Sequence, residues 1–128
     1  MKLIIEPPTW LGDSVMASGA IKALIDNLNP SKAILFGSFV ATEILKDYFD
    51  EIIVRSKSFK EVISFPKSDI FVSFKRSFYS KLLGVKAKKS YFFDSKFFSS
   101  HMVEKYSSYV NLILNKSEIY KPTLPFVP

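Results

Sequence analysis

The sequence predicts an α/β protein with a parallel sheet covered by helices on both faces. Short apolar runs, typical of buried strands, alternate along the chain with segments whose apolar residues recur every three or four positions, as in helices. This alternation repeats at short intervals, which favours parallel strands joined by helical crossovers. The 128 residues are enough for one domain, and a hydrophobic fraction of 48% can supply its core.

The first unit of this pattern is a strand over residues 2–6, which Pro7 and Pro8 end. Gly12-Asp13-Ser14 then opens a helix that residues 27–30 end, and we expect Asp13 or Ser14 as its N-cap because short polar side chains cap helices well. Further strands are predicted at 33–36, 51–54, 69–74 and 89–93, and further helices at 39–48, 59–65, 77–83 and 101–114. Residues 1–115 form the predicted domain, and residues 116–128, with three of the seven prolines, are expected to be a linker.

Composition narrows the class of protein. The net charge of +6 indicates an anionic partner, which would be nucleic acid, an acidic membrane surface or a phosphorylated substrate. The absence of cysteine excludes disulfides, and with a single histidine we expect no metal site. No apolar run approaches the roughly 18 to 20 residues of a membrane span, and the apolar start is too short for a signal peptide, so we expect a cytoplasmic protein.

Much of the positive charge lies in one segment, where a single acid, Asp94, accompanies seven basic residues: Lys75, Arg76, Lys81, Lys86, Lys88, Lys89 and Lys96. It can be a solvated helix face beside a lysine-protected sheet edge. It can also contact anionic lipid through Lys81, Lys86, Lys88 and Lys89. Single-stranded nucleic acid is a third alternative, through Phe78, Tyr79, Tyr91, Phe92 and Phe93. We do not expect nucleic acid, because most of these aromatic residues fall on predicted core positions.

The loop of residues 6–13 is the candidate for chemistry, because open parallel sheets bind ligands beyond the carboxyl ends of their strands. Gly12 allows a ligand to approach the backbone closely. Asp13 lies at the start of a helix, and the dipole of that helix favours the ionised carboxylate. Such a carboxylate can take a proton from a hydroxyl group, although it can also be an ordinary helix cap. The loop contains neither G-x-G-x-x-G nor G-K-[ST], so we do not expect NAD or ATP to bind here.

Residues Pro8–Leu24, with Trp10-Leu-Gly-Asp13 at their centre, resemble the opening of the ADP-heptose:lipopolysaccharide heptosyltransferases, glycosyltransferase family 9. This sequence motif is more similar to that of heptosyltransferase II than to that of heptosyltransferase I. Two weaker matches follow in order: Arg76-Ser77 resembles the family's F-R-S segment, and residues 101–106 resemble its H-x-V-E-[RK]-Y helix start.

The resemblance implies the N-terminal half of a GT-B fold, in which two Rossmann-like domains enclose the active site. This half would take a lipid-linked inner-core saccharide as acceptor, and a C-terminal domain would bind ADP-heptose. The reaction inverts the anomeric centre without a metal or other cofactor, and Asp13 would be its general base. Acceptor-binding roles would fall to Thr9, Trp10, Gly12, Lys75, Arg76, Ser77 and His101. Trp10 can instead be a hydrophobic plug, and His101 can instead cap the last helix.

Members of this family are more than twice as long as this chain. We therefore expect the donor-binding half to be missing and the chain alone to have no transferase turnover. Peripheral contact with the anionic inner membrane would suit a lipid-linked acceptor. The alternative is a non-catalytic basic α/β module that binds an anionic polymer or membrane surface. The oligomeric state is not predicted.

Overall fold

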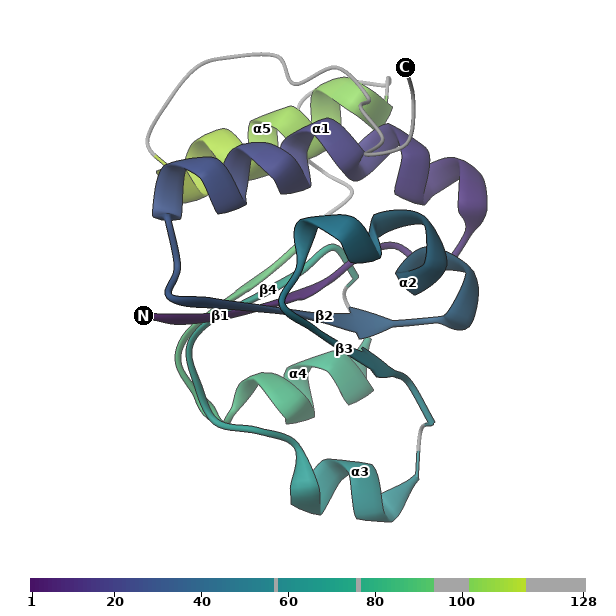
Figure 1. Cartoon of the computed structure of the whole chain (residues 1–128), viewed down its shortest axis with the longest axis vertical. Helices are drawn as coiled ribbons and strands as arrows, with labels where there is room; N and C mark the ends of the chain where they lie inside the picture. The colour runs from purple at the N-terminus through teal and green to yellow at the C-terminus, as the bar shows by residue number, and fades with distance from the viewer. Residues whose placement is uncertain (57, 76, 94–101, 115–128) are drawn as a thin grey trace.

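The computed structural model describes residues 1–56, 58–75, 77–93 and 102–114, and the side chains of the last segment from residue 106 onward. They form a five-stranded parallel sheet with helices on both faces, which confirms the predicted fold class (Figure 1). The strands are β1 (Lys2–Glu6), β2 (Lys32–Gly37), β3 (Glu51–Val54), β4 (Ser68–Ser73) and β5 (Ala87–Phe92). The helices are α1 (Leu11–Leu28), α2 (Phe39–Leu45), α3 (Phe59–Ser64), α4 (Phe78–Gly84) and α5 (Met102–Leu114), and a short 3₁₀ turn, Lys46–Tyr48, follows α2.

The strand order is β3-β2-β1-β4-β5. The chain therefore starts in the middle of the sheet, moves outward to β3, and returns to the other side of β1 with β4. The order reverses between β1 and β4, and such a switch point is where open α/β sheets leave a crevice for ligands. The loops that follow β1 and β4 are the two that border this crevice.

The helices cover the two faces in separate groups. In Figure 1, α1, α5 and α2 lie above the sheet, and α3 and α4 lie below it. The side chains of β1 alternate between the two layers, because successive residues of a strand point to opposite faces. Leu3 and Ile5 join the core under α1 and α5, and Ile4 joins the core that α3 and α4 cover. Both faces of the central strand are therefore buried from Leu3 to Glu6.

The start of α1 differs from the sequence prediction. The helix begins at Leu11 after Trp10, whose side chain does not cap it, so Asp13 or Ser14 as N-cap is wrong. The Ser14 hydroxyl donates instead to the carbonyl oxygen of Pro8, at 2.9 Å. It thereby ties the helix to the preceding loop, and Asp13 lies in the first turn of the helix.

Three other helices share one way of starting. Ser38, Ser58 and Ser77 are the N-caps of α2, α3 and α4, and each accepts a hydrogen bond from a backbone N–H of the first turn. A phenylalanine follows each of these serines. The predicted linker 116–128 lies outside the described residues, as do Arg76 and His101. In the described part of the chain, no helix is long and apolar enough to cross a membrane.

Candidate functional site

The loops that follow β1 and β4 are joined across the switch point. The Lys75 ammonium donates a hydrogen bond to the Thr9 hydroxyl at 2.7 Å. Below it, the backbone N–H of Phe74 donates to the Glu6 carbonyl oxygen at 2.8 Å, and the backbone N–H of Lys75 donates to the Ser73 hydroxyl at 3.0 Å. Thr9 and Lys75, which the sequence assigned to one site from distant positions, are therefore in direct contact.

Two helices fix the loop that follows β1. The hydroxyl of Ser14 in α1 donates to the Pro8 carbonyl, and the hydroxyl of Ser38, the N-cap of α2, donates to the Thr9 carbonyl at 2.9 Å. The indole of Trp10 is 74% exposed, so the alternative of a buried plug is wrong. The loop backbone is thus held rigidly while its tryptophan faces solvent.

The Asp13 carboxylate is half-buried in the first turn of α1. The carboxylate lies at the positive end of the helix dipole. Among the described residues, we find no hydrogen bond or ion pair to this carboxylate. Burial, and then the negative charge of Asp13, raise the pKa of Tyr106 in α5. The carboxylate can therefore accept a proton from a hydroxyl group that approaches from solvent.

Gly12 is not required by the fold. A Cβ atom at this position would meet no other atom within 4 Å, and no glycine of the described residues has a positive φ. The glycine therefore leaves open space beside Asp13, as a site for a ligand near the backbone would need.

Three further residues were predicted for acceptor binding: Ser77, Arg76 and His101. The Ser77 hydroxyl accepts a hydrogen bond from the Ser80 backbone N–H at 3.0 Å, and its role in the structure is to cap α4. The predictions for Arg76 and His101 lie outside the described residues. The structure thus brings Thr9, Trp10, Gly12, Asp13 and Lys75 to one edge of the sheet.

A buried ion pair beneath this edge was missed by the sequence analysis. Glu6, 1% exposed at the end of β1, lies 3.1 Å from a guanidinium nitrogen of Arg55, which is 6% exposed. One Glu6 carboxylate oxygen also accepts hydrogen bonds from the hydroxyls of Ser73 at 2.6 Å and Ser80 at 2.5 Å. The two-residue period of β1 gave a signal, since it places Glu6 on the same buried face as Ile4.

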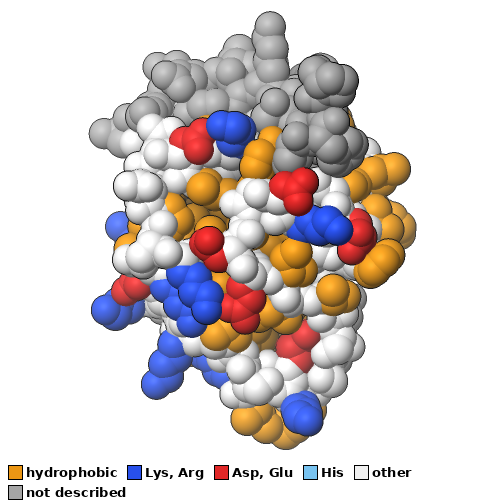
Figure 2. Space-filling view, viewed as in Figure 1, with side chains coloured by type: hydrophobic (Ala, Val, Ile, Leu, Met, Phe, Trp, Pro, Cys, Tyr) orange, Lys and Arg blue, Asp and Glu red, His pale blue; other side chains and the backbone are white. Residues whose placement is uncertain are grey.

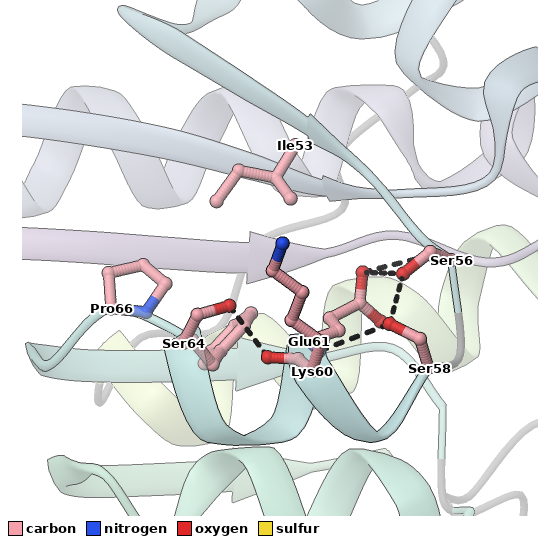
Figure 3. Close-up of a pocket in the computed structure, with 8 residues that line it drawn as sticks. Ile53, Ser56, Ser58, Lys60, Glu61, Ser64 and Pro66 are labelled. Carbon is pink, nitrogen blue, oxygen red and sulfur yellow. Dashed lines mark hydrogen bonds between the residues drawn. The ribbon is translucent and has the colours of Figure 1, made fainter.

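A small pocket of about 230 Å³ lies between β3 and α3, and none of the residues predicted for the site lines it (Figure 3). The Glu61 carboxylate at its wall already accepts hydrogen bonds from the backbone N–H and hydroxyl of Ser56 and from the Tyr79 hydroxyl. This carboxylate therefore links α3 to its neighbours, and we assign no chemistry to the pocket. Its lining residues are Ile53, Ser56, Ser58, Lys60, Glu61, Ser64, Phe65 and Pro66.

Comparison with known proteins gives two curated relatives, both named lipooligosaccharide heptosyltransferase 2. The protein of Campylobacter jejuni serotype O:2 is 36% identical over 98% of this chain and 43% of its own length, and that of serotype O:6 is 35% identical over the same shares. The chain thus spans less than half the length of these relatives. No protein-family model and no solved structure matches. The chain belongs to the heptosyltransferase family over the segment that it shares with these two proteins.

Proposed function

We propose that this chain forms the acceptor-binding side of a glycosyltransferase that acts in the synthesis of the lipopolysaccharide core. The donor would be ADP-heptose, bound by a part of the enzyme other than this chain, and the acceptor an inner-core saccharide. The observation that carries the proposal is the half-buried Asp13 carboxylate at the β1–β4 switch point. The two Campylobacter relatives, both named as heptosyltransferases, support transfer of a heptose as the reaction in which this carboxylate would act.

In the proposed reaction, Asp13 is the general base. Its carboxylate takes the proton of an acceptor hydroxyl while the hydroxyl oxygen forms a bond to the anomeric carbon of the heptose. The bond from that carbon to ADP breaks, and ADP leaves with the electron pair. Attack from the face opposite the leaving group inverts the anomeric configuration.

Thr9, Trp10 and Lys75 are proposed to position the acceptor. The exposed indole of Trp10 offers a flat apolar surface to a sugar ring, and the loop beneath it is held by Ser14 and Ser38. Lys75 fixes the Thr9 side chain and brings a positive charge to the site, which favours an acidic or phosphorylated saccharide.

The first experiment uses Trp10, the single tryptophan of the chain, as a fluorescent probe. Titration with a phosphorylated inner-core saccharide is expected to give a saturable change in Trp10 emission. The variant Lys75→Met should weaken this binding, and Asp13→Asn should retain it within a few-fold. An emission that does not respond at millimolar saccharide would contradict the proposed acceptor site.

The second experiment tests the base. This chain would replace the matching segment of the Campylobacter jejuni serotype O:2 relative, and heptose transfer from ADP-heptose would be measured. Asp13→Asn is expected to lower kcat by about 10²–10⁴-fold, the range for loss of a general base, while the saccharide still binds. An Asp13→Asn chimera with the turnover of the parent chimera would exclude Asp13 as the base.

A further inference from the structure

The outward face of α4 is apolar although the fold does not require it. Ser80, Leu83 and Gly84 form the buried side of this helix. The opposite side carries side chains at the i, i+3, i+4 and i+7 positions of one helical stripe: Phe78, Lys81, Leu82 and Val85, all exposed. The Phe78 ring is 82% exposed, so it adds almost nothing to the core.

The neighbouring helix α3 extends this surface with Phe59, 80% exposed, and with the exposed side chains of Lys60 and Ile63. The two helices are firmly connected. The Tyr79 hydroxyl of α4 donates to Glu61 of α3. The ammonium of Lys86, in the turn that follows α4, donates to the Ile63 carbonyl oxygen of α3 at 2.6 Å. We call this surface the α3–α4 face and define it by Phe59, Lys60, Ile63, Phe78, Lys81, Leu82 and Val85. Figure 2 shows hydrophobic side chains at the lower edge of the molecule, over α3, with a basic side chain beside them.

The sequence segment that carries the α3–α4 face is rich in positive charge. Residues 59–92, from α3 to β5, contain eight basic residues and two acidic ones, Glu61 and Asp69. Glu61 is buried, and Asp69 pairs with Lys88 at 3.3 Å. Residues 11–50, which include α1 and α2, contain three basic and five acidic residues. The exposed apolar side chains of the α3–α4 face therefore belong to a segment with a marked excess of basic residues.

We propose that the α3–α4 face docks on an anionic lipid surface. Large apolar side chains with lysines among them fit such a surface, because the apolar groups enter the acyl boundary while the ammonium groups remain among the headgroups. Ile63, Leu82 and Val85 favour lipid over nucleic acid, since aliphatic side chains insert into hydrocarbon and offer no ring on which bases stack. This surface is separate from the site at Asp13, and the proposal does not depend on the proposed function.

The structure changes which side chains would contact lipid. Of the four lysines singled out in the sequence, Lys81 alone belongs to the α3–α4 face. Lys86 is held by carbonyl oxygens at the end of α3, Lys88 pairs with Asp69, and the Lys89 ammonium lies 5.8 Å from the centre of the Tyr91 ring. Phe78, one of the five aromatic residues considered for nucleic-acid stacking in the sequence, is exposed on this face. Phe59 and Phe78 would be the main anchors.

Vesicle sedimentation with the 128-residue chain tests the proposal. We expect binding to phosphatidylglycerol vesicles, weak binding to phosphatidylcholine vesicles, and weaker binding to the former as the salt concentration rises. Phe78→Ser and Phe59→Ser should each lower the partition coefficient by about tenfold or more, because the free energy of burying one phenylalanine side chain corresponds to a change of that factor. Lys81→Ala should lower it by about fivefold, the effect of one lysine near an anionic surface.

Phe39→Ser is the matched control. Phe39 also follows a serine N-cap as the first residue of a helix and is 65% exposed, but it lies in the acidic part of the chain. This variant should bind vesicles as the parent chain does. Circular dichroism would verify that all variants fold, and saccharide binding by Trp10 emission should be unchanged in Phe78→Ser, which separates this test from that of the proposed function.

Four results would overturn the proposal. In the first, Phe39→Ser lowers vesicle binding as much as Phe78→Ser. In the second, the parent chain binds neither type of vesicle. In the third, light scattering shows a dimer that Phe78→Ser dissociates, and the face then serves a second copy of the chain. In the fourth, an oligonucleotide binds in a manner that requires Phe78, and the face then serves a nucleic acid.

Discussion

Replacing Arg55 with methionine tests whether the ion pair beneath the site is a true charge pair. Glu6 and Arg55 are both almost inaccessible, and the guanidinium also lies over the Phe36 ring, 5.7 Å from its centre. Removal of one partner of a buried pair costs about 3–5 kcal/mol, because the other charge stays buried without compensation. We expect the lower end of this range, about 3 kcal/mol, because the hydroxyls of Ser73 and Ser80 still donate to Glu6.

A loss of this size is a large part of the roughly 5–15 kcal/mol by which domains are stable. It should lower the urea midpoint by about 1–3 M, measured by circular dichroism. The double variant Glu6→Gln/Arg55→Met should recover part of the loss, since it removes the uncompensated charge. Lys22→Met is the control, because it breaks an exposed pair with Asp26 worth about 0.5 kcal/mol or less. An Arg55→Met midpoint as high as that of Lys22→Met would refute the reasoning.

Three more predictions concern the glycines and the buried tyrosines. Gly84→Ala should destabilise the chain by about 1–2 kcal/mol in thermal melts, since its Cβ would lie 2.8 Å from the Phe92 ring; a raised melting temperature would contradict this. Gly12→Ala, with open space around its Cβ, should raise stability by up to about 1 kcal/mol through helix propensity yet weaken saccharide binding by Trp10 emission; tighter binding would show that no ligand uses this space. Burial raises the pKa of Tyr106 and Tyr109, so at high pH these hydroxyls stay protonated in the folded chain while they ionise in the unfolded one. The free energy of unfolding should therefore fall as the pH rises above about 10, and urea midpoints measured over this range would show it. Tyr106→Phe should reduce the dependence of the midpoint on pH.

The fold could be predicted because its signals are local. The apolar runs of β1, β2, β3 and β4 and the apolar period of α1 specify elements without reference to their neighbours. The start of α1 was misplaced because its first turn has no capping side chain and its hydroxyl at Ser14 bonds backward to Pro8. An apolar period locates the body of a helix better than its first turn.

The site could be predicted only in part, because its contacts join distant segments. Asp13 and Gly12 belong to one recognisable loop, and a parallel sheet puts Lys75 on the same edge as that loop. The strand order, which the sequence did not predict, is what brings Lys75 beside Thr9. The partner of Glu6 did not follow from any spacing. Arg55 comes after an edge strand, and only the register of β1, β2 and β3 brings its guanidinium over Phe36 to the end of β1.

The two proposed surfaces together predict how a substrate would reach Asp13. Helices that follow parallel strands begin at the carboxyl edge of the sheet, so Phe59 and Phe78 at the starts of α3 and α4 lie toward the same edge as the first turn of α1. A lipid surface against the α3–α4 face would therefore extend past the switch point, where an acceptor anchored in that surface would be concentrated near the site. In the chimera, Phe78→Ser should then lower kcat/KM for a lipid-linked acceptor in phosphatidylglycerol vesicles and leave kcat/KM for the free saccharide unchanged. Equal losses for both acceptors would mean that Phe78 affects the site itself, and the membrane would then have no part in substrate capture.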